Sequence, residues 1–424
     1  MELLGGYEKM NLFEPADILL PKEVDMEKWS VIACDQFTSQ PEYWEKVEEN
    51  VGNAPSTLRL IFPEAKLGEE SKEMVVQIRA AMEQYLAEGL FEEHKNAYVY
   101  VERTLLDGSV RKGVVGAMNL DEYDYSPHSM AAIRATEKTV VERIPPRKVI
   151  RENAIMELPH ILLFSDDEKD LMCGYLESVK EELPLLYDFE LMEEGGRIVG
   201  RLVHGAHLEQ FTGKMEAYGD YIVDKYKEAK NIPMMFAVAD GNHSLATAKA
   251  CYEELKLKNP DKNAAVHPAK YALVEIVNIH DEAQKFEPIH RIVKNVDVNA
   301  ILGALILDSC AEEGYPVKWY SGKKHGTVYL DPSKGQLPIG ILQNFLDEYL
   351  SVHLGVIDYI HGEDVLKGLS EEPNSIGFEL PTIDKNKFFK GIIEDGVFPR
   401  KTFSTGHAQE KRYYLEARKI VEEI

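Results

Sequence analysis

The chain has little cysteine and no long apolar segment. Its four cysteines, Cys34, Cys173, Cys251 and Cys310, lie far apart in 424 residues. None of their spacings matches the paired cysteines of zinc or dithiol sites, so we interpret them as reduced and mostly structural. No apolar run approaches the roughly 18 to 20 residues that cross a membrane, and the first residues lack a basic segment followed by an apolar one. These absences predict a cytoplasmic protein with no membrane partner.

Basic residues are also in short supply. The chain has 48 Lys and Arg against 73 Asp and Glu, which gives a formal net charge of −25. Binding to a nucleic-acid backbone requires an excess of cations at the contact, so we predict no nucleic-acid partner. Any phosphate group must then be held at a local site. The segment RIPPRKVIREN, residues 143–153, stands out as locally basic in this acidic chain.

The hydrophobic patterns predict an α/β (α+β) fold with a mixed sheet and additional helical and sheet layers. Residues 72–91 place apolar side chains three and four apart, which indicates an amphipathic helix. Apolar stretches on both sides of Asp107 and Gly108 are typical of an antiparallel hairpin. Residues 196–208 and 270–279 have the composition of further strands.

The length of the chain favours two or three structural units. We interpret residues 1–95 as an N-terminal region and residues 96–295 as a catalytic core. Residues 296–424 are then a C-terminal region that contributes to the site. Oligomeric state is not predicted.

A short apolar strand, MMFAVA, runs directly into Asp240 and Gly241, and a helical pattern follows with Leu245, Ala248 and Tyr252 on one stripe. A helix start offers unpaired backbone N–H groups and the positive end of the helix dipole, so an anion is bound well there. The pattern therefore predicts a phosphate site between strand and helix. A simple Asp-Gly turn without any ligand fits the same pattern about equally well.

Each residue of this turn suits phosphate chemistry. Gly241 lets backbone and ligand approach closely, and His243 can donate to a phosphate oxygen. Asp240, at the end of the strand, can hold Mg²⁺ or orient a nucleophile. We therefore expect Mg²⁺ as a cofactor, with Asp240 as its ligand.

Motifs along nearly the whole chain resemble a family of bacterial and archaeal proteins catalogued as a domain of unknown function, the DUF-ten-fifteen family. The family's central motif is Asp-Gly-His-His-Arg at the start of a helix, and this chain has Asp240, Gly241, Asn242, His243 and Ser244 there. Further family-like landmarks follow in the same order: CDQFTSQPEYW, RATEKTV, EPIHRIV, YIHGED and FPRKTF. Several weak motifs in one order are more specific than any single one.

The central motif is also similar to the Gly-x-His-Arg element of the ParB and sulfiredoxin superfamily, which includes free L-serine kinases. The resemblance implies a ParB/sulfiredoxin-like catalytic core and a kinase that converts free L-serine to O-phospho-L-serine. It further implies inorganic pyrophosphate as the phosphoryl donor. Sulfiredoxin chemistry needs a thiol where this chain has Asn242, and partition-type DNA binding needs a basic surface, so we disfavour both branches.

Within that resemblance, the candidate catalytic carboxylates are Glu137 of RATEKT, then Asp240, then Asp35 of CDQF. One of them must take the proton of the serine hydroxyl, which is a poor nucleophile at neutral pH. A Glu on a helix surface beside Lys138 explains Glu137 about equally well. Arg134 and Thr139 are candidates for binding the substrate's charged ends.

Ser244 stands where the family commonly has Arg, so another cation must neutralise the phosphate. The predicted phosphate-binding residues are Gly241, Asn242, Ser244, His290, Arg291, Arg400 and Lys401. The pairs His204/His207 and His280/His290 lack metal-binding spacing, and we interpret them as core or surface histidines.

Two alternative functions remain open. One is a non-catalytic sensor of a phosphometabolite or nucleotide, and the other is an ATP- or ADP-dependent kinase of another small hydroxyl substrate. The sequence has no Walker-type glycine loop, which fits either pyrophosphate or an unusual nucleotide site.

Overall fold

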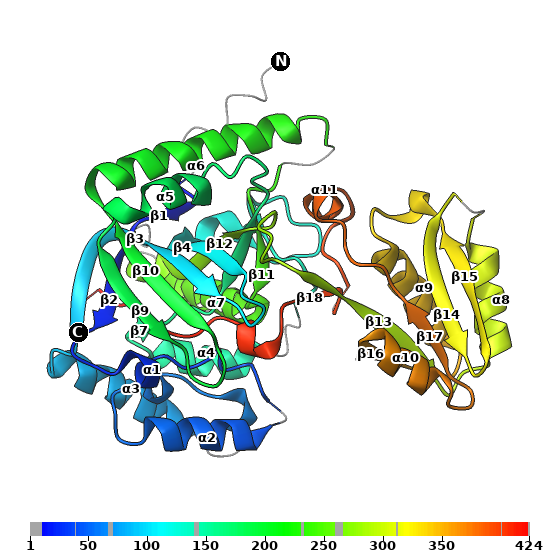
Figure 1. Ribbon diagram of the computed structural model, residues 1–424, viewed down its shortest axis with the longest axis horizontal. Coiled ribbons are helices and arrows are strands. Elements are labelled where there is room, and N and C mark those ends of the chain that lie inside the picture. Colours follow the sequence, from blue (N-terminus) through cyan, green and yellow to red (C-terminus); the bar gives the residue numbers. More distant parts are fainter. Residues whose placement is uncertain are drawn as a thin grey trace.

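The computed structural model describes residues 11–38, 40–66, 71–139, 144–229, 233–258, 266–310, 313–399 and 401–422, and leaves the side chains of residues 71, 72 and 146 undescribed. The chain forms a larger body around one mixed sheet and a smaller body around a second sheet (Figure 1). The mixed α/β fold class with additional helical and sheet layers is therefore confirmed.

The large sheet mixes parallel and antiparallel neighbours. In spatial order its main path consists of β5 (Tyr123–Asp124), β6 (Ile133–Arg134), β11 (Phe236–Asp240), β8 (Leu162–Ser165), β12 (Tyr271–Asn278), β4 (Val110–Asn119), β3 (Phe91–Thr104), β10 (Arg197–Val203) and β9 (Leu185–Glu190). Two further strands pair with it, namely β1 (Phe13–Glu14) with β4 and β2 (Ala16–Pro21) with β3. Strand β11 runs parallel to β6 and antiparallel to β8, so it is an interior strand.

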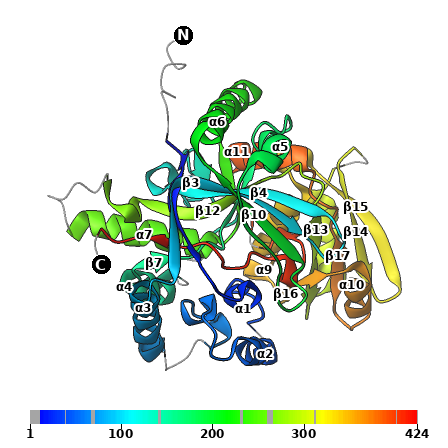
Figure 2. The ribbon, with the colours of Figure 1, turned by 60° about the vertical axis from the view of Figure 1, so that its left-hand side comes forward.

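Both faces of this sheet are buried. Along β3, Tyr98 and Tyr100 belong to one hydrophobic cluster, whereas Val99 and Val101 belong to the other. This alternation follows from the two-residue period of a strand. Helices cover the two faces: α5 (Cys173–Val179) and α6 (Gly205–Lys225) lie on one side, and α1 (Met26–Trp29), α2 (Pro41–Val51) and α3 (Ser71–Ala87) lie on the other (Figures 1 and 2). Helix α4 (Ile144–Asn153) packs against α7 (Asn242–Lys258).

The smaller body is an antiparallel sheet with helices on both faces. Its strands are, in spatial order, β15 (Lys324–Leu330), β14 (Tyr315–Ser321), β17 (Ile376–Glu379), β13 (Phe286–Lys294) and β16 (Val356–His361). Its helices are α8 (Val298–Asp308), α9 (Pro338–Val352) and α10 (Glu363–Ser370). The start of β13 pairs with β18 (Phe403–Thr405), and its remainder pairs with β16 and β17. Strand β13 therefore connects the two bodies, with α11 (Lys385–Asp395) above this connection (Figure 1).

After β18 the chain returns through the larger body as a largely buried segment, residues 408–419. Arg103 donates hydrogen bonds to the carbonyl oxygens of Gln409 (3.0 Å) and Lys411 (3.2 Å), and Arg111 donates to that of Glu410 (3.1 Å). The segment ends in β19 (Arg418–Lys419), which pairs with β7 (Met156–Glu157). This arrangement places the end of the chain next to residues from its centre.

Most predicted elements match the structure, with one clear difference. The predicted strand over residues 196–208 ends at Val203, and α6 begins at Gly205, which has a φ of +55°. The predicted domain division remains a prediction, and its first boundary lies inside β3. Among the residues described, no helix combines the length and the apolar composition needed to span a membrane.

Candidate active site

The Asp-Gly turn joins a buried strand to a helix, as predicted. Residues Phe236 to Val238 of β11 are almost fully buried, and α7 begins at Asn242. Gly241 has a φ of +81°, a backbone conformation that L side chains rarely adopt. Its carbonyl accepts the N–H of Leu245 at 3.0 Å, which closes the first turn of α7. The helix start is thus formed by the local sequence.

Gly241→Ala is expected to destabilise the protein by about 1–3 kcal/mol, since a non-glycine residue at this φ is strained. An added Cβ would also lie 3.0 Å from Cγ1 and 3.2 Å from Cα of Ile161. Urea unfolding measures the change in free energy. Gly213→Ala in α6 is the matched control, because a Cβ there meets nothing within 4 Å and the φ is not positive. The control should be stabilising by about 0.4–1 kcal/mol, and equal effects of the two substitutions would contradict the role of Gly241.

A cavity of about 170 Å³ opens beside this helix start. Segments far apart in the chain line it: Asp35, Glu137, Lys138, Arg147, Asp240, Gly241, Asn242, His243 and Ser244. Three carboxylates, two cations and the first residues of α7 thus share one small space. All three predicted catalytic carboxylates are among them.

Both carboxylate oxygens of Asp240 contact polar groups of the chain. Its Oδ1 accepts the N–H of Gly241 at 2.9 Å, and its Oδ2 lies 3.3 Å from Nζ of Lys411. The Lys411 ammonium also donates to the carbonyl oxygen of Thr405 at 3.1 Å. Sequence reasoning missed Lys411, which is 171 residues away and carries no motif signal of its own.

Glu137 lies in an extended segment and not on a helix surface, because residues 136–138 pair in parallel with Phe398. Its carboxylate accepts two backbone N–H groups, from Thr402 at 3.0 Å and from Lys401 at 3.2 Å. Burial raises the pKa of Glu137 above its usual value, although these two N–H groups, Arg291 and Lys401 act in the opposite direction. The carboxylate therefore positions the backbone of Lys401 and Thr402 and is also a stronger base than an exposed Glu.

The cations of the cavity come from residues that were not predicted as phosphate ligands. Arg147 projects from α4 and forms an ion pair with Glu64. Lys138 is exposed, and its backbone N–H donates to the carbonyl oxygen of Phe398 at 3.2 Å. The local basic excess of residues 143–153 was the available signal for Arg147.

Several predicted ligands lie away from the cavity lining. Arg291 is fully buried and donates to the carbonyl oxygen of Lys401 at 2.9 Å and to Oε1 of Gln343 at 2.8 Å, with its guanidinium over the ring of Tyr359. The geometry makes Arg291 a support of the backbone at Lys401. His290 is buried as well, and its Nδ1 accepts the N–H of Leu380 at 3.2 Å. Burial lowers the pKa of His290, which favours the neutral imidazole.

The predicted substrate ligands are buried too. Arg134 is 2% exposed and donates to the carbonyl oxygen of Ala131 at 2.8 Å. The hydroxyl of Thr139 is buried and has no hydrogen-bond partner within the described ranges. Neither lines the cavity, and neither does Lys401, whose backbone has a φ of +60°. Arg400 lies outside the described residues. The roles assigned to these four residues stay predictions.

Ser244 and Asn242 complete the cavity at the start of α7. The Oγ of Ser244 lies 2.8 Å from Nε2 of His160. The amide oxygen of Asn242 is buried and has no hydrogen-bond partner in the described part of the chain, which leaves this oxygen free to accept a hydrogen bond from a ligand.

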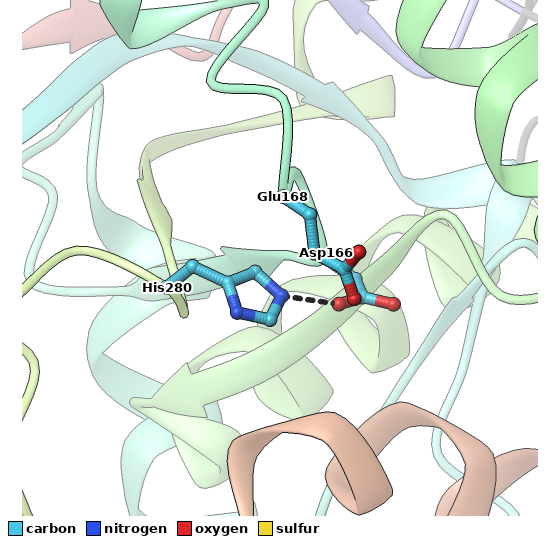
Figure 3. A group of neighbouring side chains, drawn as sticks. All are labelled: Asp166, Glu168 and His280. Carbon is cyan, nitrogen blue, oxygen red and sulfur yellow. Dashed lines mark hydrogen bonds and ion pairs between the residues drawn. The ribbon is translucent and has the colours of Figure 1, made fainter.

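A second polar cluster consists of Asp166, Glu168 and His280, whose ligand atoms lie within 4.8 Å of one another (Figure 3). His280 Nε2 lies 2.6 Å from Oδ1 of Asp166. The ammonium of Lys225 contacts both carboxylates, Asp166 at 2.7 Å and Glu168 at 2.8 Å. A cation is thus already supplied by the chain, and the cluster connects the ends of β8 and β12 to α6 as an ion-pair network. His280 and Lys225 lie far from Asp166 and Glu168 in the sequence, so no spacing predicted the cluster.

The family model described as protein of unknown function (DUF1015) matches residues 16–334. The chain belongs to this family, which confirms the resemblance seen in its motifs. A search of curated proteins finds no match.

Among solved structures, the chain is similar to a mutant free serine kinase in complex with ADP, with 12% identity and a TM-score of 0.35 over 74% of this chain and 93% of that one. It is also similar to SbnI with a C-terminal truncation from Staphylococcus aureus, with 12% identity and a TM-score of 0.34 over 69% of this chain and 83% of that one. A third similar structure, a conserved hypothetical protein from Pyrococcus furiosus, has 14% identity and a TM-score of 0.27 over 62% of this chain and 95% of that one. Similarities at this level carry no argument about activity.

Proposed function

We propose that this protein is a phosphotransferase that phosphorylates free L-serine to O-phospho-L-serine with inorganic pyrophosphate as donor. The observation that carries the proposal is the cavity at the start of α7, which combines helix N–H groups, two cations and three carboxylates. Phosphoryl transfer depends on positioning and on electrostatic stabilisation of the transferring group, and these groups supply both. The likeness of the central motif to free L-serine kinases supports serine as the acceptor.

The donor phosphate binds at residues 241–244. Backbone N–H groups at a helix start and the helix dipole favour an anion at this position. Arg147 and Lys138, which also line the cavity, add positive charge. Arg147 takes the place of the family's motif Arg, since a guanidinium binds two phosphate oxygens at once.

Glu137 accepts the proton of the serine hydroxyl in this proposal. A general base works best when its pKa lies near the working pH, and burial moves the pKa of Glu137 in that direction. The backbone N–H groups of Lys401 and Thr402 hold the carboxylate in place by two hydrogen bonds.

Mg²⁺ fits the donor set of the same cavity. Carboxylate oxygens are its preferred protein ligands, and phosphate oxygens and water complete its coordination. Asp240 and Asp35 are the residues that would hold the ion. When bound, Mg²⁺ would neutralise charge on the phosphate oxygens.

The decisive test of the proposed function is a product assay. The protein is incubated with Mg²⁺, L-serine and, in separate reactions, pyrophosphate, ATP or ADP, and phosphorus NMR follows the appearance of phosphoserine. We expect phosphoserine and inorganic phosphate with pyrophosphate. Parallel reactions with threonine and homoserine measure how strictly serine is selected.

The assay also separates the alternatives. Product with ATP or ADP alone would assign a nucleotide donor, and product with another acceptor would reassign the substrate. Binding of pyrophosphate by calorimetry without turnover of any acceptor would contradict the kinase proposal and favour a phosphometabolite sensor.

A further inference from the structure

Three side chains form a continuous hydrogen-bonded chain into the candidate active site. Ser244 Oγ lies 2.8 Å from His160 Nε2, and His160 Nδ1 lies 3.0 Å from the hydroxyl of Tyr414. His160 and Tyr414 are buried, with exposures of 9% and 3%. A hydroxyl on a buried imidazole that is oriented by a third group is the geometry of an activated nucleophile.

The contacts of Tyr414 fit the tautomer of His160 that carries its proton on Nδ1. Burial, together with Cys34 and Asp35, raises the pKa of Tyr414 well above its usual value, so this phenol keeps its hydrogen. The phenol oxygen accepts the backbone N–H of Cys34 at 3.2 Å, and the phenol also interacts with the Cys34 side chain. We assign the tautomer of His160 in which Nδ1–H donates to this oxygen. Nε2 is left with its lone pair toward the Ser244 hydroxyl.

Ser244 also occupies a special position between two cavities. The phosphate cavity described above adjoins a mostly apolar cavity of about 160 Å³ that contains His160 and Tyr414 in its lining. Ser244 and Arg147 line both cavities. A phosphate bound at the start of α7 therefore meets the hydroxyl of Ser244 on one side and the guanidinium of Arg147 on another.

We propose that Ser244 is a catalytic nucleophile that carries the phosphoryl group, with His160 as its base and Tyr414 as a positioning residue. This inference rests on the proposed function. In the first step Ser244 Oγ attacks a phosphorus of pyrophosphate. The Oγ–P bond forms, the bridging P–O bond breaks, inorganic phosphate leaves, and the hydroxyl proton moves to His160 Nε2.

In the second step the acceptor hydroxyl attacks the phosphorus on Ser244. The new O–P bond forms as the Oγ–P bond breaks, the hydroxyl proton moves to Glu137, and Ser244 Oγ recovers its proton from His160. The reaction therefore has two half-reactions, and the first needs no acceptor. Ser244 performs chemistry that the Arg of the family motif cannot perform.

An isotope-exchange experiment without serine tests the first half-reaction. The protein is incubated with Mg²⁺, unlabelled pyrophosphate and labelled inorganic phosphate. We expect label to enter pyrophosphate, and peptide mass spectrometry to find one phosphoryl group on Ser244. Ser244→Ala should show neither result. Ser351→Ala, which removes an exposed hydroxyl on α9, is the matched control and should behave as the wild type.

His160→Gln keeps the nucleophile and removes the base. Loss of a general base should slow formation of the phosphoserine on the protein by about 10²–10⁴-fold, while its final stoichiometry remains unchanged. Tyr414→Phe should slow phosphorylation of Ser244 less than His160→Gln does, since Phe retains the ring and loses only the hydroxyl. Equal thermal melting of the variants and the wild type shows that the effect is chemical. A fall in both melting temperature and stoichiometry with an unchanged rate would indicate a structural role and overturn the inference.

The outcomes separate this inference from the proposed function. If the wild type makes phosphoserine from serine without isotope exchange, and Ser244→Ala retains that activity, direct transfer operates and the covalent step is wrong while the kinase proposal stands. If neither phosphoserine nor exchange appears with any donor, the proposed function is wrong and the covalent step falls with it. With ATP as the active donor, the same exchange is measured with labelled ADP.

Discussion

Replacing Glu137 by Gln is expected to lower the rate of serine phosphorylation by about 10²–10⁴-fold, the usual contribution of a general base. The amide cannot accept the hydroxyl proton, but it can still accept one of the two backbone N–H groups that the carboxylate binds. Steady-state rates by phosphorus NMR measure the effect. Glu49→Gln on the exposed face of α2 is the control and should leave the rate unchanged.

The dependence of the wild-type rate on pH should reveal the ionisation of the Glu137 carboxylate. Burial raises the pKa of Glu137, and only the ionised form can accept a proton. The rate should therefore rise as the pH rises through this pKa, with its midpoint above the usual value for Glu. If the fall in rate at low pH persists unchanged in Glu137→Gln, the general base is instead Asp35 or Asp240. Loss of pyrophosphate binding in the variant would show that Glu137 acts by positioning the backbone of Lys401 and Thr402.

Arg412→Met is expected to destabilise the protein by about 3–5 kcal/mol, because it leaves two buried carboxylates without their cation. Arg412 donates to Glu275 and to Glu416 at 2.5 Å each, and all three side chains are at most 1% exposed. The hydroxyl of Tyr187 also donates to Glu416 at 2.5 Å. Equilibrium unfolding in urea measures the loss.

An exposed ion pair is the matched control for this substitution. Arg197 binds Asp188 in a pair whose side chains are 52% and 32% exposed. Arg197→Met should cost only about 0.2–1 kcal/mol. If Arg412→Met costs no more than this control, the buried network does not anchor the C-terminal segment. A triple variant that also carries Glu275→Gln and Glu416→Gln should recover part of the loss, since no unpaired charge is then buried.

The local elements of the site followed from the sequence, since they depend on short-range physics. An apolar strand, a glycine that can adopt positive φ and an amphipathic helix pattern are sufficient to form the turn at Gly241. The landmarks that resemble the family also led to Asp35 and Glu137. The fold brings both into the cavity that Asp240 lines.

The cations of the site could not be identified in the same way. Arg291 and Arg147 both occur in segments with notable composition, but one is fully buried in hydrogen bonds to Lys401 and Gln343, and the other lines the cavity. Whether an Arg contacts a ligand depends on which neighbours take its donors, and those neighbours are distant in sequence. Lys411 approaches Asp240 only because the C-terminal segment returns through the larger body.

The sequence by itself determined the family, the mixed α/β class and the strand–turn–helix element that begins at Asp240, because motif order and hydrophobic periodicity are properties of the chain alone. Only the tertiary structure decided that Arg147 and not Arg291 lines the cavity, and that His160 and Tyr414 orient Ser244. These contacts join residues more than 80 positions apart. They follow from strand order and from the largely buried path of residues 408–419, which no local pattern encodes.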